Sequence, residues 1–432
     1  MPSTPSALGA PFPLNGVRVL DFGWYLASAG GTRFLSSLGA EVIKVEFKTN
    51  PDTRMAAMAP IGGRAAREAA TGPLPGVTDP DMGGQFNNKN PGKLGLSLNV
   101  RHPKGLEIAR RLVAMSDIVS EGFSPGVLEK WGMGYDELVK LNPRIIVAKQ
   151  SGMGTQGSFG RFRTIGQVAA AFSGLSELSG FPEPAQPAGW GYSYLDWIAA
   201  YSFAQSMLTA LYYRDVTGKG QYIDASQTES GIYQAGVAVL DWSANQRAAT
   251  RTGNRARGRD AAPHGVYRCL GEDRWIAIAC LTEQQWTALA ASAQDASWST
   301  DPRFSTLASR LRHQDELDRQ LNAWTAAQEA YPLMHRLQQA GVPAGVCQTA
   351  EDRCDNDPQL AHLGWLTEVT GTKIGRWPVA EMAARLSRTP AYAGGRIDRG
   401  APCYGEDNHY ILGRLLGLSS QEISELEDEG VI

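Results

Sequence analysis

Two short apolar runs joined by a helical stretch restrict the possible folds more than any other feature of the sequence. The runs, Val17 to Phe22 and Glu41 to Glu46, are rich in β-branched residues and predict buried strands. Between them, Ala27 to Leu38 predicts a helix. Strands joined by a helical crossover run parallel, because the helix returns the chain to the end where the first strand began. A parallel sheet is therefore expected.

The same alternation continues along the chain. Residues 105–116 and 135–141 have the apolar periodicity of amphipathic helices, and 117–120 and 144–149 are short apolar runs typical of buried strands. This order predicts a doubly wound α/β fold, in which ligands usually bind beyond the carboxyl ends of the strands. Residues 50–85 are rich in Gly, Pro, Ala and Met and predict a long surface excursion.

Several motifs of nucleotide and metal enzymes are absent from the sequence. Gly23 to Ala27 follow the first expected strand without the G-x-G-x-x-G pattern that a dinucleotide-binding turn requires. The P-loop and H-E-x-x-H patterns are missing as well. We therefore expect neither a nicotinamide cofactor nor a metal ion.

The composition indicates the compartment of the protein and the classes of partner that it binds. At 432 residues, the chain is long enough for two domains, and its formal net charge of −3 gives no general attraction to nucleic acid. Neither a signal peptide nor an apolar run of the ~18 residues that span a membrane is evident. The five cysteines are odd in number and lack C-x-x-C spacing, as is typical of reduced thiols. These features predict a cytoplasmic protein that binds neither membranes nor nucleic acid.

Asp196 stands between two contrasting segments. A Pro- and Gly-rich loop, 181–190, precedes it, and an apolar helical run, 198–213, follows it. A carboxylate there either caps the helix by accepting backbone N–H bonds or acts as a nucleophile where water is excluded. Six aromatic residues suit a pocket for a bulky or aromatic acid as well as core packing: Trp24, Tyr25, Trp190, Tyr192, Tyr194 and Trp197.

The second half of the chain predicts a further α/β module and a helical tail. The module has expected strands at 266–269 and 275–279 and expected helices around 283–291 and 314–327. In the tail, 406–432, a group of leucines is expected to face inward.

Six motifs occur in an order and spacing that are more specific than any one of them. They are L-N-G-V-R-V-L-D-F (14–22), L-G-A-E-V-I-K-V-E (38–46), S-E-G-F-S-P-G-V (120–127), T-G-K-G-Q (217–221), A-G-V-P-A-G (340–345) and L-L-G-L-S (415–419). With these motifs the chain resembles the class III CoA-transferases, the CaiB/BaiF family of formyl-CoA transferase and carnitine CoA-transferase. The resemblance covers Pro13 to Ile432.

The resemblance implies an interlocked dimer in which two chains thread through each other. Each chain is expected to contain a large Rossmann-like domain (14–228), a linker with a mobile loop at 253–260 (229–260), a small α/β domain (261–375) and a C-terminal return to the large domain (376–432). Asp196 falls on the position of the family's catalytic aspartate, so the resemblance favours the nucleophile over the helix cap.

The resemblance also implies where CoA is bound. The expected contacts are Leu26, Ala27, Leu98, Arg101, Phe123 and Lys130. Among them, Arg101 and Lys130 are expected to meet phosphates. The sequence departs from the family pattern at Phe47, where a basic residue is common, and at Gly122, which is often Asn.

The implied activity is transfer of CoA from an acyl-CoA donor, such as succinyl-CoA, to a carboxylic acid. Aspartyl anhydride and aspartyl-CoA thioester intermediates carry the transfer, so neither ATP nor a metal is required. The aromatic run around Asp196 looks more like enzymes of aromatic acid breakdown, such as benzylsuccinate CoA-transferase, than like formyl-CoA transferase. The expected partners are acyl-CoA, a small carboxylic acid and a second chain, identical or homologous.

Three alternatives accompany this interpretation. An α-methylacyl-CoA racemase would share the fold, but residues 163–168 contain no histidine to act as its base, and only His264 remains as a substitute. The others are a subunit of a hetero-oligomeric CoA-transferase and a non-catalytic acyl-CoA-binding module. The presence of Asp196 argues against an inactive chain.

Overall fold

The protein is described by a computed structural model that covers residues 11–49, 51–54, 69, 71–72, 79–189, 191, 193–256, 260–293 and 296–432. The chain divides into two compact units. The first comprises Met1–Leu175, Trp190–Ala244 and Pro358–Ile432, and the second comprises Ser176–Gly189 and Asn245–Asp357. Most of the 50–85 excursion and residues 257–259 of the expected mobile loop lie outside the described residues.

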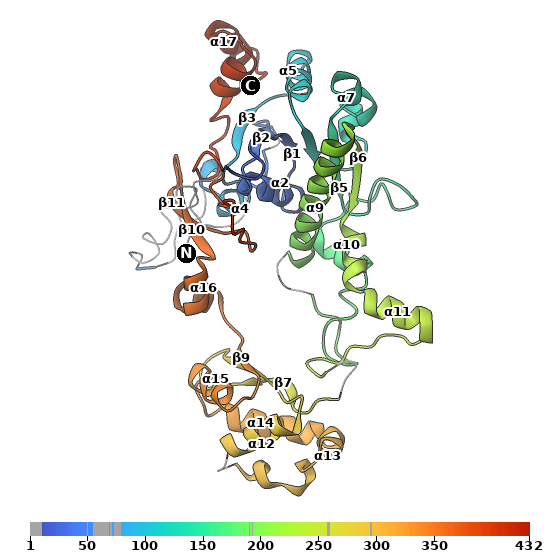
Figure 1. Ribbon diagram of the computed structural model, residues 1–432, viewed down its shortest axis with the longest axis vertical. Coiled ribbons are helices and arrows are strands. Elements are labelled where there is room, and N and C mark those ends of the chain that lie inside the picture. Colours follow the sequence, from blue (N-terminus) through green and yellow to red (C-terminus); the bar gives the residue numbers. More distant parts are fainter. Residues whose placement is uncertain are drawn as a thin grey trace. The chain divides into compact units, whose positions relative to one another are not determined.

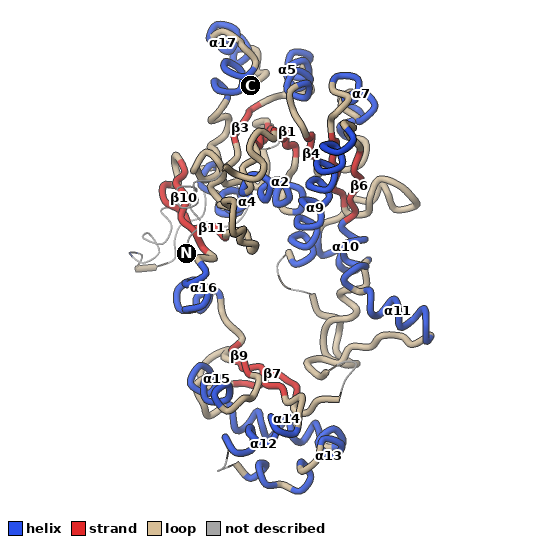
Figure 2. The backbone as a smooth tube through the Cα atoms, viewed as in Figure 1, coloured by secondary structure: helices blue, strands red, loops and turns tan. Residues whose placement is uncertain are grey.

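A six-stranded sheet forms the centre of the first unit (Figures 1 and 2). Its strands are β1 (Arg18–Phe22), β2 (Glu41–Glu46), β3 (Leu94–Ser97), β4 (Ile118–Glu121), β5 (Ile146–Ser151) and β6 (Tyr222–Ser226). They lie in the order β3-β2-β1-β4-β5-β6, and each neighbouring pair is parallel. The predicted doubly wound α/β fold is confirmed, and its strand order reverses between β1 and β4.

Helices cover both faces of this sheet. The helices of this part of the chain are α2 (Ala27–Ser37), α4 (Gly84–Lys89), α5 (Pro103–Ala114), α6 (Val127–Lys130), α7 (Tyr135–Leu141), α8 (Gly166–Phe172), α9 (Tyr194–Thr217), α10 (Gln227–Gln234) and α11 (Gly236–Asn245), with a 3-10 turn η1 (Pro80–Met82). Successive strand residues point to opposite faces. Val19 therefore packs with α2 and α9, whereas Leu20 packs with α5 and α7.

The C-terminal part of the chain belongs to the first unit. It contains α16 (Pro358–Leu363), the antiparallel pair β10 (Leu366–Gly371) and β11 (Gly375–Ala380), the π-helical η5 (His409–Leu415) and α17 (Ser420–Asp428). Asn99 donates its backbone N–H to the carbonyl oxygen of Val431 over 2.7 Å. Leu412 is fully buried in the same core as α5, whereas Leu415, Leu416 and Leu418 are half-buried against it.

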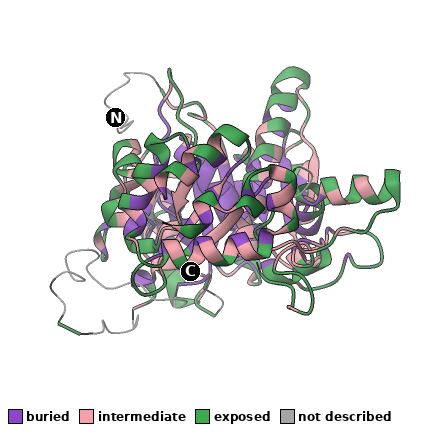
Figure 3. Cartoon of the chain, turned by 90° about the horizontal axis from the view of Figure 1, so that it is seen from below, coloured by how far each residue is buried: buried purple, intermediate pink, exposed green. Residues whose placement is uncertain are grey.

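The second unit has its own small sheet and core. The sheet consists of the antiparallel strands β7 (His264–Arg268), β8 (Trp275–Ala279) and β9 (Ala344–Val346). It packs with the helices α12 (Glu283–Ser292), α13 (Leu307–Arg312), α14 (Gln314–Thr325) and α15 (Ala330–Gln339). The short elements are the 3-10 turns η2 (Ser297–Thr300) and η3 (Pro302–Phe304) and the π-helical η4 (Asp352–Asn356). In Figure 3 the buried residues gather on strands and inward helix faces, and the outer helix faces are exposed. Among the described helices, none combines the length and apolar character needed to cross a bilayer.

Candidate active site

A pocket of about 810 Å³ lies at the carboxyl ends of the parallel strands, in the first unit. Residues at the ends of five strands or shortly after them line it: 24–28 after β1, Phe47 and Thr49 after β2, 98–101 after β3, Gly122, Phe123, Ser124, Val127 and Trp131 after β4, and 150–152 at the end of β5. This edge is where doubly wound folds bind ligands, next to the reversal of strand order. The pocket is large enough for a cofactor-sized ligand.

The loop between β1 and α2 is held in a strained conformation. Tyr25 has a φ of 57°, a left-handed value that side chains other than glycine rarely adopt, and its side chain is exposed. Its backbone N–H donates to Oδ1 of Asp52 over 2.8 Å, and Lys44 Nζ donates to the carbonyl oxygen of Gly23. Backbone strain of this kind persists only where the surroundings fix it, and it is common at ligand sites.

Two buried ion pairs fix the side chains that contact the backbone of this loop. Lys44 Nζ lies 2.9 Å from Oδ2 of Asp52, and Lys93 Nζ lies 2.9 Å from Oδ2 of Asp21. Burial alone would raise the pKa of Asp52, but the charge and hydrogen bond of Lys44 outweigh it and lower that pKa. Asp52 therefore stays ionised as the acceptor for the Tyr25 N–H.

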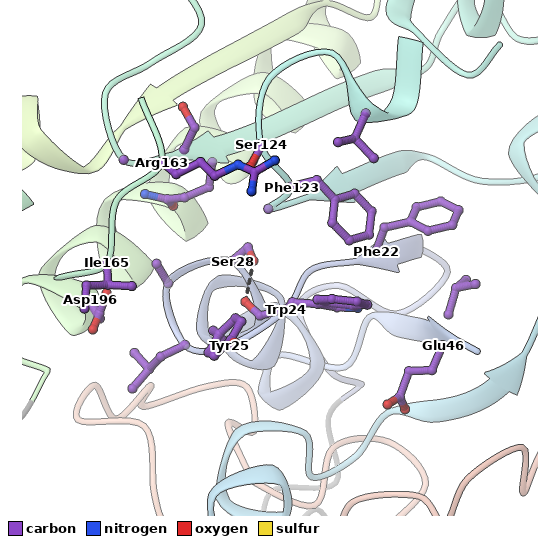
Figure 4. Close-up of a pocket in the computed structure, with 18 of the residues that line it drawn as sticks. Phe22, Trp24, Tyr25, Ser28, Glu46, Phe123, Ser124, Arg163, Ile165 and Asp196 are labelled. Atoms are coloured by element: carbon purple, nitrogen blue, oxygen red, sulfur yellow. Dashed lines mark hydrogen bonds between the residues drawn. The ribbon is translucent and has the colours of Figure 1, made fainter. Parts of the chain in front are cut away.

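Aromatic rings gather at one end of the pocket. Trp24 and Phe123 meet edge to face with ring centroids 5.2 Å apart, and Phe123 and Trp131 meet in the same way at 5.3 Å. The guanidinium of Arg101 lies 5.9 Å from the centre of the Trp131 ring. Figure 4 shows Phe22, Trp24 and Phe123 close together, away from Asp196 and Ile165. We call these two regions the aromatic end and the aspartate end.

Asp196 lies in the first turn of α9, two residues after the helix begins. The N-cap is Ser193, in a left-handed conformation with a φ of 56°. The helix-cap interpretation of Asp196 is therefore wrong, because the helix already begins at Tyr194. Nε2 of Gln227, the first residue of α10, donates to Oδ1 of Asp196 over 2.5 Å.

Gly166 leaves just enough room for this carboxylate. A Cβ atom added to Gly166 would lie 2.4 Å from Oδ2 of Asp196, well inside contact distance. Gly166 begins α8, so the 163–167 segment forms the wall behind the aspartate. A glycine is required there because any side chain would displace the carboxylate.

The surroundings of Asp196 raise its pKa. Burial is the main cause, and hydrogen bonds from Gln227 and Ser193 and the charge of Lys89 oppose it. A partly desolvated carboxylate held by directed hydrogen bonds is suited to nucleophilic attack.

Polar groups line the wall near the 163–167 segment. Gln150 Oε1, Ser151 Oγ and Thr164 Oγ1 are buried and have no hydrogen-bond partner among the described residues. Buried polar atoms are normally paired, so these three are available to a ligand. Within the part of the chain that the structure describes, no three His, Cys, Asp or Glu side chains are grouped to hold a metal ion.

Comparison with known proteins identifies the family of the chain that contains this pocket. The family model of CoA-transferase family III matches residues 14–408. The chain belongs to the family III CoA-transferases. This match confirms the resemblance that the six motifs indicated. Members of the family take CoA thioesters as substrates.

Relatives match the CoA-transferase over nearly its whole length. The succinyl-CoA–D-citramalate CoA-transferase of Chloroflexus aurantiacus is 32% identical over 427 residues, covering 98% of each chain. The alpha subunit of succinyl-CoA–L-malate CoA-transferase from Chloroflexus aurantiacus is 30% identical, covering 100% of this chain and 95% of that protein. A crystal structure of a CaiB/BaiF family protein from Brucella suis has a TM-score of 0.81 at 25% identity, covering 94% of this chain and 100% of that chain.

The CoA-transferase pocket brings together most of the residues expected to contact CoA. Leu26, Ala27, Leu98, Arg101 and Phe123 all line it together with Asp196. Lys130, the last residue of α6, is exposed and does not line it. Phe47, where the family often has a basic residue, lines the pocket as well.

The aromatic residues expected near Asp196 have different positions. Trp24 and Tyr25 line the pocket. Trp197 instead packs in the core between α2 and α9, where the centroid of its ring lies 6.3 Å from that of Phe34. Tyr194 is half-buried in the first turn of α9, outside the lining. Trp190 and Tyr192 lie outside the described residues. His264, the possible base of a racemase, belongs to β7 of the second unit, with Nδ1 2.6 Å from the carbonyl oxygen of Asn254.

Sequence reasoning missed three residues that surround Asp196. Gln227 follows directly after β6, so its place at the carboxyl edge of the sheet was a usable signal. Gly166 and Lys89 gave none, because their nearness to Asp196 depends on how α8 and α4 pack.

Proposed function

We propose that this CoA-transferase moves CoA between two carboxylic acids through covalent intermediates on Asp196. The observation that carries the proposal is the setting of this carboxylate. It lies in the pocket, is partly desolvated, and accepts a hydrogen bond from Gln227 while Gly166 keeps space open beside it. CoA is proposed to lie along Leu26, Ala27, Leu98, Arg101 and Phe123, at the aromatic end, with Lys130 as a further phosphate partner.

The first half of the reaction loads CoA onto the enzyme. The Asp196 carboxylate attacks the thioester carbonyl of the donor, and the C–S bond breaks to give an aspartyl anhydride and CoA thiolate. The thiolate then attacks the aspartyl carbonyl and breaks its C–O bond. The products are an aspartyl-CoA thioester and the donor acid, released as its carboxylate.

The second half repeats these steps with the acceptor. Its carboxylate attacks the aspartyl-CoA carbonyl, which gives a second anhydride and the thiolate. Attack of the thiolate on the acceptor carbonyl forms the new acyl-CoA and restores the Asp196 carboxylate. Each intermediate reacts with water, so the pocket must exclude it during turnover.

Trapping the intermediate tests this proposal. Incubation with donor acyl-CoA and hydroxylamine should convert Asp196 to its hydroxamate, seen by mass spectrometry as a small mass increase on one peptide. Asp196→Asn should abolish turnover and trapping but keep CoA binding. Asp215→Asn, at the exposed far end of α9, is the matched control and should react as the parent does. Turnover in Asp196→Asn without an adduct in the parent would refute the proposal.

We propose succinyl-CoA as the donor and a dicarboxylic acid as the acceptor. The support is that one relative is named for succinyl-CoA and citramalate and another for succinyl-CoA and malate. A bulky or aromatic acceptor such as benzylsuccinate, itself a dicarboxylic acid, is the second choice, supported by Tyr25 in the lining. A screen of acids with succinyl-CoA and acetyl-CoA as donors, followed by mass spectrometry, separates them.

Racemisation is less well supported than transfer. It needs a group that abstracts the α-proton of the acyl-CoA, usually histidine in this fold. The described residues that line the pocket include no histidine, and Gly166 occupies the wall behind Asp196. Proton exchange at the α-carbon in deuterated buffer, without CoA transfer, would favour the racemase.

We further propose that the working enzyme is a dimer, of identical or homologous chains, with interlocked subunits. Helix α11 has no buried residue, and Val237 and Leu240 on it are exposed at 80% and 69%. Apolar residues gathered in this way favour a protein partner. One relative is named as an alpha subunit, which supports the heteromeric form. An active monomer in light scattering at low concentration would exclude both forms.

A further inference from the structure

Four lysines of the first unit are almost completely buried, and three of them are neutralised by carboxylates. Lys44 pairs with Asp52, Lys93 with Asp21, and Lys149 with Glu121. A buried ammonium requires such a partner, because its desolvation is costly. The fourth lysine, Lys89, differs from these three.

Lys89 is the last residue of α4, and its exposed fraction is 4%. Its Nζ donates a hydrogen bond to the side-chain oxygen of Gln85 over 3.2 Å. Among the described residues, no carboxylate oxygen lies within 4.0 Å of this nitrogen. Gln85 is neutral, so the hydrogen bond gives Lys89 no direct carboxylate partner. The charges of Asp52 and Asp196 act on Lys89 from beyond ion-pair distance and raise its pKa.

Lys89 and Asp196 line the same pocket, at its aspartate end. The two groups influence each other: the charge of Lys89 lowers the pKa of Asp196, and Asp196 raises that of Lys89. Burial has the largest effect on Lys89 and lowers its pKa. A cation that is buried, lacks a close carboxylate and lines a ligand pocket indicates an anionic group on the ligand.

We propose that Lys89 binds the second carboxylate of a dicarboxylic substrate while the first reacts at Asp196. The inference rests on the proposed function, because it places the reacting carboxyl group at this aspartate. The substrate class is a short dicarboxylic acid and its mono-CoA thioester. Donor and acceptor react in turn at the same aspartate, so one lysine would serve both halves of the reaction.

A different role for Lys89 would give different kinetics. If it served only as a counter-ion for Asp196, every acid would depend on it equally. As a specificity-determining residue, it should matter only for substrates with a second carboxylate. The comparison therefore needs two acids of equal length, one with that group and one without.

Succinate and butyrate form this pair, and acetyl-CoA is the common donor. In the parent, kcat/KM for succinate should exceed that for butyrate by about 10- to 100-fold, which is the usual effect of a hydrogen bond to a charged group. Lys89→Met should remove the preference by weakening succinate alone, and Lys89→Arg should retain part of it. Lys140, on the exposed side of α7, is outside the pocket lining, so Lys140→Met is the matched control and should keep the preference.

Each other outcome is informative. Equal losses for both acids in Lys89→Met, or loss of the preference in Lys140→Met as well, would overturn the inference. If Lys89→Met does not fold, the parent and Lys89→Arg decide: a parent without a preference refutes the inference, and a preference that Lys89→Arg reduces supports it. A parent that transfers CoA to no acid in the screen would refute the proposed function and, with it, this inference.

Discussion

Nε2 of Gln227 donates to Oδ1 of Asp196 over 2.5 Å, and the two residues are 31 positions apart in the sequence. Asp196 belongs to the first turn of α9, whereas Gln227 begins α10, directly after the edge strand β6. The hydrogen bond therefore ties the candidate nucleophile to the edge of the sheet. It also favours the ionised aspartate, because an amide N–H binds a carboxylate more strongly than a carboxylic acid.

Gln227→Leu should shift the pH dependence of the reaction. The Gln227 hydrogen bond lowers the pKa of Asp196 against the effect of burial, so its loss should raise that pKa further. The acid limb of the kcat/KM profile should then move to higher pH, with kcat/KM near neutrality falling about 10-fold or more. Gln234→Leu, on the exposed far end of α10, should leave the profile in place. An unchanged acid limb in Gln227→Leu would show that the amide does not act on Asp196.

Asp196→Asn should be more stable than the parent at neutral pH. The native pKa of Asp196 is raised above the ordinary value of 3.8, so the folded state holds the proton more tightly than the unfolded chain does. The stability this contributes is fully present below that value and is lost as the pH rises through the raised pKa. Asparagine does not ionise and avoids the loss. Thermal unfolding should give Asp196→Asn the higher Tm at pH 7 and a vanishing difference in acid, and the opposite order would contradict this.

Gly166→Ala should reduce turnover without unfolding the protein. The new Cβ would lie 2.4 Å from Oδ2 of Asp196, so the carboxylate must move. A displacement of about 1 Å can lower kcat by about 100-fold. The control is Gly345→Ala in β9, where an added Cβ meets no atom within 4 Å. Parent-like kcat in Gly166→Ala, with an unchanged Tm, would mean that the carboxylate tolerates the shift.

Arg101→Ala and Lys130→Ala should have unequal effects on CoA binding. Arg101 lines the pocket beside Trp131, whereas Lys130 is exposed and outside the lining. We expect Arg101→Ala to raise KM for every acyl-CoA donor by about 10-fold with little change in kcat, because a phosphate contact binds substrate and transition state alike. Lys130→Ala should raise KM less. Steady-state kinetics with two donors measures both, and a larger effect at Lys130 would contradict this order.

Asp52→Ala should destabilise the first unit. It removes the carboxylate 2.9 Å from the Lys44 ammonium and the acceptor of the Tyr25 N–H. Leaving one partner of a buried pair without the other costs about 3–5 kcal/mol. The double variant Lys44→Met with Asp52→Leu removes both charges and should lose less stability than Asp52→Ala. Urea unfolding at neutral pH gives the comparison, and a double variant that is the least stable would show that the pair itself stabilises the fold.

The sequence predicted the strands and helices whose apolar pattern is strong. The range of β2 and that of α7 match the expected ones, because each is a short periodic segment with clear ends. Strand β3 was missed: it has only four residues, and its Gly95 is a poor strand former. The glycine is explained by the C-terminal segment, since a Cβ there would lie 2.9 Å from the carbonyl oxygen of Cys403. Local pattern contains no information on such a distant contact.

The candidate site was also predicted only in part. Asp196 and the expected CoA contacts were predicted from their positions relative to the motifs that mark the family, and all but Lys130 line the pocket. Gln227, Gly166 and Lys89 belong to no such motif, and their role depends on tertiary packing around the aspartate. The start of α9 was misplaced because Tyr194, Asp196 and Trp197, which have only moderate helix propensity, belong to its first turn, and the helix has no side-chain cap.

The two ends of the pocket are built from separate stretches of the chain. The aromatic end is built on the loops after β1 and β4, and the aspartate end on α4, the 163–167 segment and the starts of α9 and α10. Under the proposed function, we therefore expect substitutions in α4 or in 163–167 to change which acid is accepted while CoA binding at the aromatic end stays constant. Such a division lets a new acid preference arise by few mutations and makes α4 the first target for redesigning the enzyme toward another carboxylic acid.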